Sequence, residues 1–305
     1  MSDEDAEDNN FKAELFLPRS TLFVPADNDK LISKAVHVEA DAICLDLEDG
    51  VSASAKKTAR TALESAGSAL KAGELSSRLL MVRVNSEPDM LEQDLASLPA
   101  QCDFVMLPKA EGLDHVQLVG EALDQISKAG GANAKIIALV EDARGLLNFR
   151  NAVSVQSGLM PHSRLAALAL GTEDFSNNLN CRPDARIMET VLHELGLVAR
   201  ALDLAVIGTP STIAEFKDLA AYETGALKGM DAGTVGGLCI HPAQVEILNK
   251  VFSPTEAQMN WALKVSSAFE LAEQRGEGVT TVDGRMVDRP VYLQARQILR
   301  RKNSS

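Results

Sequence analysis

The chain has 305 residues, of which 43 are Asp or Glu and 30 are Lys or Arg, so its formal net charge is −13. This acidic balance disfavours a nucleic-acid-binding protein, which needs a concentrated basic face, and it disfavours attraction to anionic membranes. No apolar run approaches the roughly 18–20 residues that a membrane-spanning helix requires. With 46% hydrophobic and 24% charged residues, the composition is that of a globular protein.

The cysteines and the first residues indicate a reducing compartment. The four cysteines, Cys44, Cys102, Cys181 and Cys239, are scattered and include no C-x-x-C pair, so we expect free buried thiols. The chain begins MSDEDAEDNN, which is acidic, whereas signal and transit peptides are basic or rich in arginine. We therefore expect residues 1–12 to form a disordered tail and the protein to be cytoplasmic.

Short apolar runs alternate with longer amphipathic stretches along most of the chain. The predicted strands are Ser20–Ala26, Asp41–Asp49, Leu79–Asn85, Phe104–Lys109, Lys135–Asp142, Arg164–Gly171, Leu202–Gly208 and Gly236–Pro242. The predicted helices between them include Ala55–Ala72, His115–Ala129 and Ala185–Ala201. Most of these strands are continuous apolar runs, which is typical of a parallel sheet that is buried on both faces.

Eight such units predict an α/β fold of the (β/α)8 TIM-barrel type over residues 13–250. An open doubly wound sheet is the alternative. That fold would normally carry a glycine-rich phosphate loop, and neither G-x-G-x-x-G nor G-x-x-x-x-G-K-[ST] occurs in the sequence.

Residues 251–305 predict a small helical extension after the barrel. The predicted helices in this part are Ala243–Val251, a long one around Trp261, and Val291–Arg301. Ser253 has the character of an N-cap, with Pro254 in the first turn and Glu256 at the capping-box position. The segment GEGVTTVDGRMVDRP is rich in turn residues. The extension is too small to fold alone, so we expect it to pack on its own barrel or on a neighbouring subunit and to contribute to an active site.

Charged residues stand where the predicted strands end. They are Asp46, Glu48, Asp49, Arg83, Lys109, Glu141, Asp142, Glu173, Asp174 and His241. Any one of them could be a helix cap or part of a surface ion pair, and for Lys109 the choice between a strand-end salt bridge and a mouth residue stays open. Because the carboxyl ends of barrel strands meet at one mouth, where barrels do their chemistry, we expect the set to converge there.

Carboxylates from neighbouring strands, without a cluster of His and Cys, suit a hard cation such as Mg²⁺. An arginine on an adjacent strand could then bind a substrate carboxylate through two parallel hydrogen bonds. This combination predicts enolate chemistry on a keto-acid or a hydroxy-acid.

Seven segments, in order, resemble the citrate lyase β-subunit-like family of the HpcH/HpaI aldolase superfamily, whose members include malyl-CoA and citramalyl-CoA lyases. The segments are RSTLFVPADNDKLISKA, DAICLDLEDGV, VRVNS, FVMLPKAEG, ALVEDARGLLNF, LALGTEDFSNNL and GGLCIHPAQVEILNKVFSP. The similarity runs from Arg19 to Pro290 and implies a TIM barrel that carries a Mg²⁺ site and binds a coenzyme A thioester.

The resemblance implies the following roles at the predicted mouth. Glu141 and Asp174 match the Mg²⁺ ligands, and Arg83 matches the residue that binds the carboxylate end of the substrate. Arg83 and Glu141 are therefore both expected to bind substrate. Asp46 and Glu48 are expected to be hydrogen-bond partners around the metal site rather than ligands.

Two further segments carry implied roles. FVPADNDKLISK matches the coenzyme A pocket, where Phe23, Lys30 and Lys34 are the contacting positions. VDGRMVDRP matches the segment whose aspartate acts as acid and base in coenzyme A ester lyases, which places that role on Asp288. Its neighbour Asp283 could instead be a turn residue. In those relatives the segment reaches into the active site of an adjacent subunit, and trimers and their dimers are common, so a homotrimer or hexamer is expected.

Three positions depart from the pattern of the family. Ala26 stands where relatives usually have Gly, and Asp142 stands where Thr is frequent. The run Ile207–Pro210 replaces a loop that carries an aspartate in many relatives, and this replacement bears on the contacts to the acyl group.

These observations predict a Mg²⁺-dependent lyase. It would cleave a short β-hydroxyacyl-CoA, such as citramalyl-CoA or malyl-CoA, to acetyl-CoA and a 2-oxo acid by retro-Claisen chemistry. The alternatives are the citryl-cleaving β subunit of a citrate lyase complex, a non-catalytic acyl-CoA-binding barrel, and a pyruvate-type class II aldolase.

Overall fold

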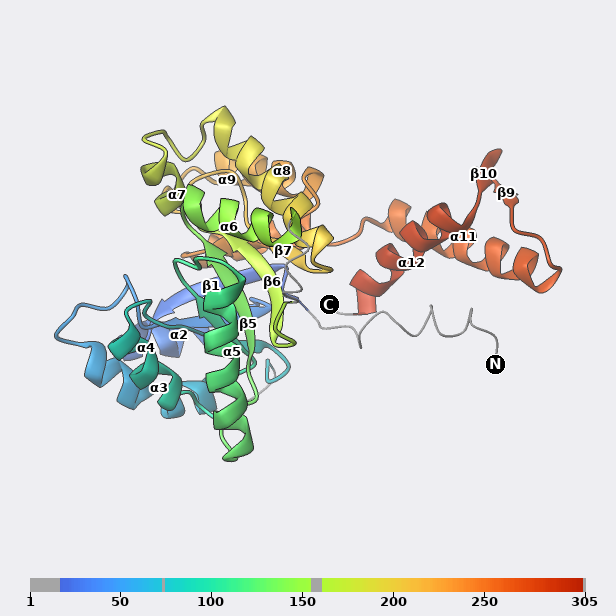
Figure 1. Cartoon of the computed structure of the whole chain (residues 1–305). Helices are drawn as coiled ribbons and strands as arrows, with labels where there is room; N and C mark the ends of the chain where they lie inside the picture. Colours follow the sequence, from blue (N-terminus) through green and yellow to red (C-terminus); the bar gives the residue numbers. More distant parts are fainter. Residues whose placement is uncertain (1–16, 73–74, 155–160, 304–305) are drawn as a thin grey trace. The chain divides into compact units, whose positions relative to one another are not determined.

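The computed structural model describes residues 17–72, 75–154 and 161–303, and the predicted acidic tail, residues 1–12, lies outside them. The chain divides into two units, residues 1–249 and 250–305 (Figure 1).

Eight parallel strands form a nearly closed barrel in the first unit, which confirms the predicted fold class. The strands are β1 (Ser20–Pro25), β2 (Ala42–Asp46), β3 (Leu79–Arg83), β4 (Phe104–Leu107), β5 (Lys135–Val140), β6 (Leu165–Leu170), β7 (Ala205–Ile207) and β8 (Gly237–Cys239). They pair in the order β7-β6-β5-β4-β3-β2-β1-β8. The barrel is drawn together between its two end strands by hydrogen bonds from Val235 N to Val206 O (2.8 Å) and from Gly208 N to Gly236 O (2.9 Å).

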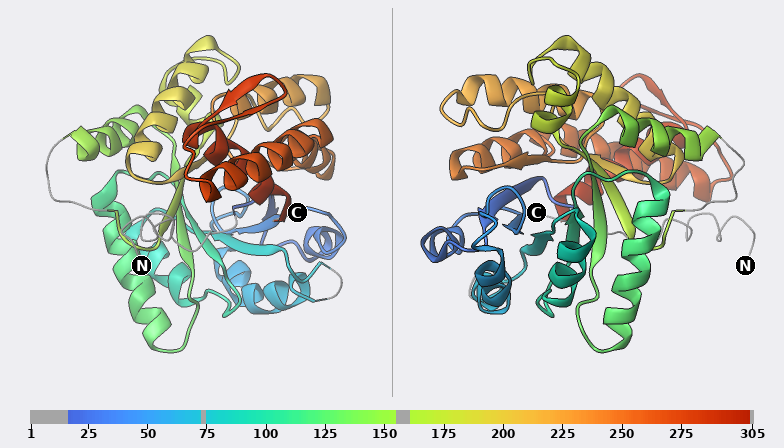
Figure 2. Two further views of the ribbon diagram at one scale, coloured as in Figure 1. Left: turned by 90° about the vertical axis from the view of Figure 1, so that its right-hand side faces the viewer. Right: turned by 60° about the vertical axis from the view of Figure 1, so that its left-hand side comes forward.

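Helices alternate with these strands and surround them, as Figure 2 shows. They are α2 (Asp29–Ala35), α3 (Lys56–Leu70), α4 (Pro88–Ala96), α5 (Leu113–Lys128), α6 (Ala143–Ser154), α7 (Thr172–Asn178), α8 (Arg186–Ala201), α9 (Leu219–Asp231) and α10 (Pro242–Val251). None of the helices in the described ranges is long and apolar enough to cross a membrane.

Both faces of the strands are buried, which is why they read as continuous apolar runs. One cluster of buried residues takes alternate positions of the strands and comprises Ala42, Cys44, Met81, Phe104, Met106, Ile137, Leu139, Ala167, Ala169, Ile207 and Leu238. The intervening positions, such as Ile43, Leu45 and Leu80, are equally buried. All four cysteines are free, as expected, but only Cys44, Cys102 and Cys239 are buried, whereas Cys181 is half-buried.

Each strand ends one to three residues before its predicted carboxyl end. The residues left over include charged ones, such as Glu48, Lys109 and Glu141. They have left the ladder of hydrogen bonds and stand in the loops, where their side chains are able to point over the mouth rather than into the apolar layer.

The second unit is a pair of helices with a short hairpin. Its elements are α11 (Glu256–Gln274), β9 (Thr280–Val282), β10 (Arg285–Val287) and α12 (Arg289–Asn303). Its own small core comprises Ala262, Val265, Phe269, Val287, Tyr292 and Ala295. The rings of Phe269 and Tyr292 stack with their centroids 4.8 Å apart.

The start of α11 differs from the prediction. The N-cap is Thr255 rather than Ser253, and the capping box closes on Gln258 rather than Glu256. Gln258 N donates to the Thr255 hydroxyl (3.2 Å), and Thr255 N donates to Gln258 Oε1 (2.8 Å), so both reciprocal bonds form two residues later than expected. Pro254 therefore precedes the cap instead of lying in the first turn.

The turn-rich segment forms an antiparallel hairpin in which Arg285 pairs with Val282. Asp283 (φ 48°) and Gly284 (φ 78°) both have positive φ, the conformation of the two-residue turn that matches the twist of paired strands. Asp283 is thus the turn residue that the sequence suggested as its alternative role.

Asp94 of α4 fixes the segment that follows β3. Its carboxylate is fully buried and accepts hydrogen bonds from Asn85 N and Asn85 Nδ2 (2.7 Å each) and from Arg60 Nε (2.6 Å). Asn85 Nδ2 also donates to Leu47 O (3.0 Å). The ends of β2 and β3, and with them the side chain of Arg83, are therefore held by one buried carboxylate.

We expect Asp94→Asn to lower the free energy of unfolding by about 2–4 kcal/mol, because an amide NH₂ would face one of these donors and the Arg60 charge would lose its partner. The control is Asp89→Asn in the first turn of the same helix, where the side chain is exposed. There we expect a loss below about 1 kcal/mol, from the helix dipole alone. Equal losses in urea unfolding of the two variants would contradict the proposed role of Asp94.

Candidate active site

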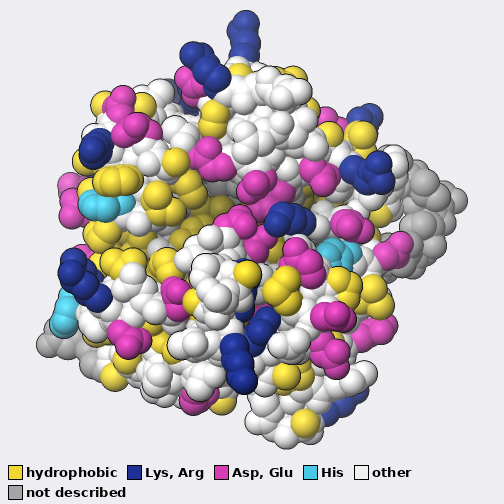
Figure 3. Space-filling model, turned by 90° about the vertical axis from the view of Figure 1, so that its left-hand side faces the viewer, with side chains coloured by type: hydrophobic (Ala, Val, Ile, Leu, Met, Phe, Trp, Pro, Cys, Tyr) yellow, Lys and Arg dark blue, Asp and Glu magenta, His cyan; other side chains and the backbone are white. Residues whose placement is uncertain are grey.

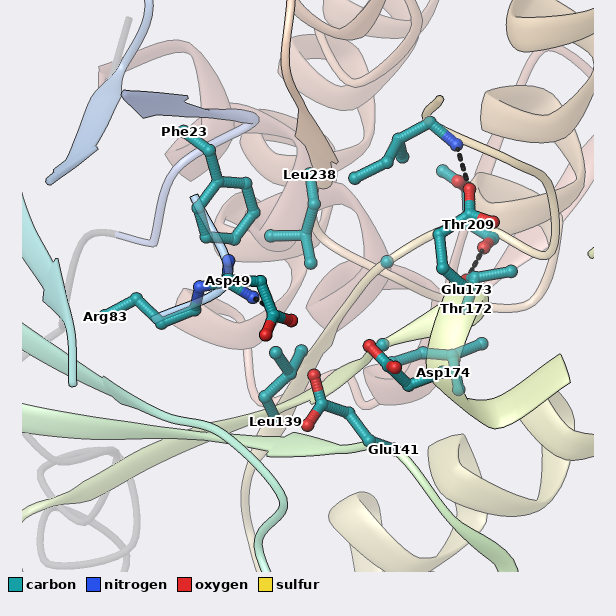
Figure 4. A pocket seen from close by; sticks show the side chains of 14 residues that line it. Phe23, Asp49, Arg83, Leu139, Glu141, Thr172, Glu173, Asp174, Thr209 and Leu238 are labelled. Atoms are coloured by element: carbon teal, nitrogen blue, oxygen red, sulfur yellow. Dashed lines mark hydrogen bonds and ion pairs between the residues drawn. The ribbon is translucent and has the colours of Figure 1, made fainter. Parts of the chain in front are cut away.

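The loops at the carboxyl ends of the strands enclose a pocket of about 180 Å³. It is lined by Phe23, Asp49, Arg83, Leu139, Glu141, Leu170, Gly171, Thr172, Glu173, Asp174, Gly208, Thr209, Ile213 and Leu238 (Figure 4). On the face of the molecule seen in Figure 3, acidic side chains gather near the centre with basic ones among them, and hydrophobic side chains line a hollow beside them. Four residues predicted for the site, Phe23, Arg83, Glu141 and Asp174, line this pocket.

Arg83, the last residue of β3, is bound on three sides. Its Nε and Nη2 donate to the two oxygens of Asp46 at 2.7 Å each, and Nη1 lies 2.9 Å from Glu48 Oε2 in an ion pair. Its guanidinium carbon lies 4.9 Å from the centroid of the Phe23 ring, a cation–π contact. Asp46 and Glu48, which were expected around the metal site, are thus bonded to Arg83.

These contacts keep Arg83 charged and oriented. Burial by itself would lower the pKa of Arg83, but the hydrogen bonds to Asp46 and the charges of Asp46 and Glu48 outweigh it and raise that pKa. A guanidinium has five N–H groups, so Nη1 and Nη2 still have donors to offer. The arrangement suits recognition of a carboxylate that enters the pocket.

Lys109 links the carboxylate of Glu48 to that of Glu141. Its Nζ lies 2.6 Å from Glu48 Oε1, and its backbone N–H donates to Glu141 Oε2 at 2.7 Å. The residue has a positive φ of 48°, which turns that N–H towards Glu141. Burial raises the pKa of Glu48, with Arg83 and Lys109 opposing it. Lys109 is therefore a salt-bridge residue that also shapes the mouth, and both of the open readings apply.

Glu141, just after β5, is buried among other negative charges. Burial, then the charges of Glu48 and Asp174, raise the pKa of Glu141 to about 8, and the Lys109 N–H and Arg83 only partly oppose them. Gly171 makes room for it, since a Cβ at that position would collide with Glu141 Cγ. Figure 4 shows the carboxylates of Glu141 and Asp174 turned towards one another. The negative charge of Asp174 thus adds to the rise in the pKa of Glu141.

The donor set agrees with a hard cation. Within the described residues, no group of three or more His, Cys, Asp and Glu side chains is arranged to hold a metal ion. Glu141 and Asp174 are thus a pair of oxygen donors, and the side chain of Asp174 makes no hydrogen bond or ion pair to another described residue. A pair of carboxylates with open positions for water and substrate is how proteins usually bind Mg²⁺.

Other predicted residues lie outside the pocket lining. Lys30 and Lys34 are exposed on α2, four residues apart on one side of the helix that follows the strand of Phe23. Asp288 belongs to the second unit, where it is half-buried and its Oδ1 accepts a hydrogen bond from Val291 N (3.2 Å) at the start of α12. Asp288 is therefore a helix cap within its own unit, whatever further role it has.

The sequence placed Glu173 and the loop after β7 near the mouth but did not predict that Glu173 fixes this loop. Glu173 Oε1 accepts hydrogen bonds from Ile213 N (2.9 Å) and from the Thr212 hydroxyl. The available signal was the adjacent pair Glu173–Asp174 at the start of a helix, where neighbouring side chains point in different directions. It could have indicated that the two acids have different partners, although both line the pocket.

Comparisons with known proteins agree with this site. A family model described as HpcH/HpaI aldolase/citrate lyase matches residues 19–242. A (3S)-malyl-CoA thioesterase of Cereibacter sphaeroides is 33% identical over 285 residues, covering 92% of this chain and 93% of the relative. The citrate lyase subunit beta of Leuconostoc mesenteroides subsp. cremoris is 30% identical over 296 residues, covering 95% and 94%. The mitochondrial citramalyl-CoA lyase of Homo sapiens is 30% identical over 302 residues, covering 92% and 84%.

A solved structure also matches nearly the whole chain. It is the protein CitE of Mycobacterium tuberculosis in complex with magnesium, acetoacetate and coenzyme A, with a TM-score of 0.67 and 28% identity. The match covers 93% of this chain and 97% of that one.

We expect the metal-free protein to lose stability as the pH rises from about 5 to about 8. Glu141 has a pKa of about 8 when folded, against an ordinary value near 4.3 in the unfolded chain. The folded state therefore holds a proton that the unfolded state releases, and the stabilisation present at low pH disappears as the pH passes the folded pKa.

Glu141→Gln keeps the shape of the side chain and removes this titration. Relative to wild type, the variant should gain roughly 2–4 kcal/mol between pH 5 and pH 8, because a tenfold change in a proton-binding constant is worth about 1.4 kcal/mol. Urea unfolding in EDTA across this range measures the difference, and Glu215→Gln, at an exposed position, is the control. Parallel stability curves for wild type and Glu141→Gln would show that Glu141 is ionised in the folded protein throughout.

Proposed function

Because the chain belongs to the HpcH/HpaI aldolase/citrate lyase family, as its motifs indicate, we propose that it is a Mg²⁺-dependent carbon–carbon lyase acting on a coenzyme A thioester. The substrate is a short β-hydroxyacyl-CoA of the malyl-CoA or citramalyl-CoA type. Cleavage gives acetyl-CoA and a 2-oxo acid.

One observation carries the proposal, namely the placement of two opposing carboxylates and a fixed guanidinium in a single small pocket. Glu141 and Asp174 face each other, and Arg83 is held beside them by Asp46 with N–H groups left to donate. A binding module for acyl-CoA has no need of both features. A retro-Claisen reaction needs both, because the substrate carries a hydroxyl group and a carboxylate on the same carbon.

Magnesium fits the residues that are present. The donors are carboxylate oxygens, and the raised pKa of Glu141, caused by burial and by the nearby charges of Glu48 and Asp174, reflects a site with too much negative charge. Glu141 and Asp174 would hold the ion. When bound, it would supply a Lewis acid that lowers the pKa of the substrate hydroxyl.

The side chains of the protein orient the substrate and return a proton to the product. Cleavage breaks the bond between the hydroxyl-bearing carbon and the α carbon of the thioester. The hydroxyl group gives its proton to water and becomes the carbonyl of the 2-oxo acid, while the bonding electrons pass to the thioester as an enolate. Arg83 orients the substrate carboxylate and offsets developing charge. Asp288 donates a proton to the enolate carbon and forms acetyl-CoA, and in the reverse direction it is the base.

We assign coenzyme A binding to Phe23, Lys30 and Lys34. Phe23 lines the pocket from β1, and the two lysines stand exposed on α2, directly after that strand. Neither lysine has an ion-pair partner among the described residues, and ammonium groups of this kind bind phosphates as point charges. The solved structure of CitE contains coenzyme A, and this supports coenzyme A as the ligand of these residues here.

Two alternatives draw on the relatives. The Cereibacter sphaeroides relative is named a thioesterase, which would release free coenzyme A and a hydroxy-acid. The Leuconostoc mesenteroides relative is a citrate lyase subunit, which works as part of a complex. The guanidinium and the carboxylate pair favour a lyase over a thioesterase, since hydrolysis of a thioester does not require a cation at the hydroxyl-bearing carbon.

We expect the purified protein to release acetyl-CoA and a 2-oxo acid from one of the two esters, malyl-CoA or citramalyl-CoA, and only when Mg²⁺ is present. Mass spectrometry identifies both products, with EDTA as the matched control. Glu141→Gln and Asp174→Asn should each lose at least a hundredfold in turnover. Free coenzyme A with malate as the products would favour the thioesterase, and ester binding without any product would favour a non-catalytic barrel or a subunit of a complex.

We expect Asp288→Asn to bind Mg²⁺ like wild type but to turn over at least a hundredfold more slowly. Asparagine keeps an oxygen to cap α12 through Val291 N, so the fold should persist. If the extension of one subunit serves the barrel of the next in a ring, co-expressed Asp288→Asn and Glu141→Gln chains should recover about a quarter of wild-type activity in mixed oligomers. Loss of activity without recovery would place Asp288 in the site of its own subunit, and undiminished turnover would refute its role as acid and base.

A further inference from the structure

The loop between β7 and α9, residues 208–218, is fixed to α7 by a single carboxylate oxygen. Glu173 Oε1 accepts hydrogen bonds from Ile213 N (2.9 Å), Ala214 N (3.4 Å) and the Thr212 hydroxyl. Figure 4 shows the Glu173 side chain beside this loop, away from the facing carboxylates of Glu141 and Asp174. Glu173 is thus an anchor for the loop.

The same loop is fixed from two other sides. The Thr172 hydroxyl donates to Thr209 O (2.6 Å). Gln244, which is fully buried, donates from Nε2 to Ile213 O (2.9 Å), and its Oε1 accepts from the backbone N–H groups of Ile240 and His241 (3.0 and 3.1 Å). Both the N–H and the carbonyl of Ile213 are therefore engaged, so this residue has a defined position against the pocket.

The loop contributes an uncharged wall to the pocket. Gly208, Thr209 and Ile213 line it, next to the apolar side chains of Leu170 and Leu238. Among the described lining residues, Arg83 is the only cationic one, against the carboxylates of Asp49, Glu141, Glu173 and Asp174. A substrate carboxylate bound to Arg83 therefore leaves no second cation for another carboxylate at this wall.

We propose that the loop anchored by Glu173 selects the acyl group, admitting a hydrogen or a methyl group on the hydroxyl-bearing carbon and excluding a second carboxylate. This inference rests on the proposed lyase function and narrows it. A methyl group can pack against Ile213, Leu170 and Leu238 and gain from burial. A carboxymethyl group would bring a negative charge among carboxylates without a hydrogen-bonding cation, and would lose its hydration. Malyl and citramalyl esters fit this wall, and a citryl ester does not.

Glu173 is a positioning residue in this scheme, because it acts on the substrate through the loop. All three of its hydrogen bonds end on one oxygen, so Gln at this position keeps the acceptor, whereas Ala removes it. The pair Glu173→Gln and Glu173→Ala thus separates the anchoring of the loop from the charge next to Asp174. Glu215→Gln, at an exposed position of the same loop, is the matched control.

The experiment measures kcat and KM of wild type and these variants on malyl-CoA, citramalyl-CoA and citryl-CoA, together with Mg²⁺ affinity. Calorimetric binding of pyruvate and of oxaloacetate in Mg²⁺ gives a second readout that does not need turnover. In wild type, we expect kcat/KM for the citryl ester to be at least a hundredfold below that for the better of the other two. Glu173→Ala should reduce this preference at least tenfold, mainly through a higher KM for the preferred ester. In Glu173→Gln and Glu215→Gln, this preference should stay within threefold of the wild-type value.

Several outcomes would overturn the inference while the lyase function stands. They are equal use of the citryl ester by wild type, an unchanged preference in Glu173→Ala, or a Glu173→Gln variant as impaired as Glu173→Ala. If Glu173→Ala does not fold, Thr212→Val, which removes one of the three donors, should reduce the preference about threefold, and an unchanged preference would count against the inference.

Failure of the lyase function has a different signature. If wild type cleaves none of the three esters, the proposed reaction fails. The inference about the loop would still be supported if wild type binds pyruvate but not oxaloacetate, and if Glu173→Ala shows a smaller difference between its affinities for the two acids. Binding of neither 2-oxo acid, or of both equally, would overturn the inference as well.

Discussion

The largely buried guanidinium of Arg83 organises the mouth of the barrel, because two carboxylates and an aromatic ring take their positions from it. Asp46 meets its Nε and Nη2 edge, Glu48 meets Nη1, and the ring of Phe23 covers one face. Burying a charge without partners is expensive, and a buried arginine is stable only where carboxylates compensate it. The backbone that carries these groups is fixed in turn by the carboxylate of Asp94, which ties the ends of β2 and β3 together. An arginine held in this way loses little freedom when a substrate carboxylate arrives.

Asp46 and Glu48 offset the positive charge of Arg83, whereas the negative charge of Glu141 and Asp174 deeper in the pocket is only partly offset. The second oxygen of Glu48, Oε1, accepts a hydrogen bond from Lys109 Nζ. The backbone N–H of Lys109 donates the one hydrogen bond described for the Glu141 side chain. The raised pKa of Glu141, due to burial and to the charges of Glu48 and Asp174, is the electrostatic cost of this imbalance. A divalent cation between Glu141 and Asp174 would relieve it. The carboxylates that destabilise the metal-free site at high pH are thus the ones that we propose as the Mg²⁺ ligands, and such a loss of stability is common at active sites.

The barrel could be predicted from the sequence because its signal is repeated. Eight apolar runs separated by amphipathic helices leave few other folds, and each of the eight barrel strands was found, shortened at its carboxyl end. The strands β9 and β10 were not predicted, because their segment is rich in turn residues. Arg83, Glu141 and Asp174 could be placed at one mouth because they end or follow strands that converge, whereas their roles were implied by the family resemblance. The anchoring role of Glu173 was not predicted because it depends on a loop forty residues later in the chain, a contact that no local pattern encodes. Likewise the capping box of α11 was placed on Ser253, since two overlapping motifs compete there and only the side-chain bonds of Gln258 decide between them.

The division of labour between strand ends and loops explains how such a site can keep its chemistry while its substrate changes. The groups suited to the reaction, Arg83, Glu141 and Asp174, stand at or directly after strands, where the barrel core fixes them. The wall formed by Thr209 and Ile213 belongs to a loop whose position depends on a few hydrogen bonds to Glu173 and Gln244. Changing those bonds, or the loop itself, alters the space next to the hydroxyl-bearing carbon without moving the carboxylate pair. Relatives that share the barrel and bear the names of thioesterase, citrate lyase subunit and citramalyl-CoA lyase are what this arrangement would produce, because selectivity varies in loops while the strands hold the reacting groups in place.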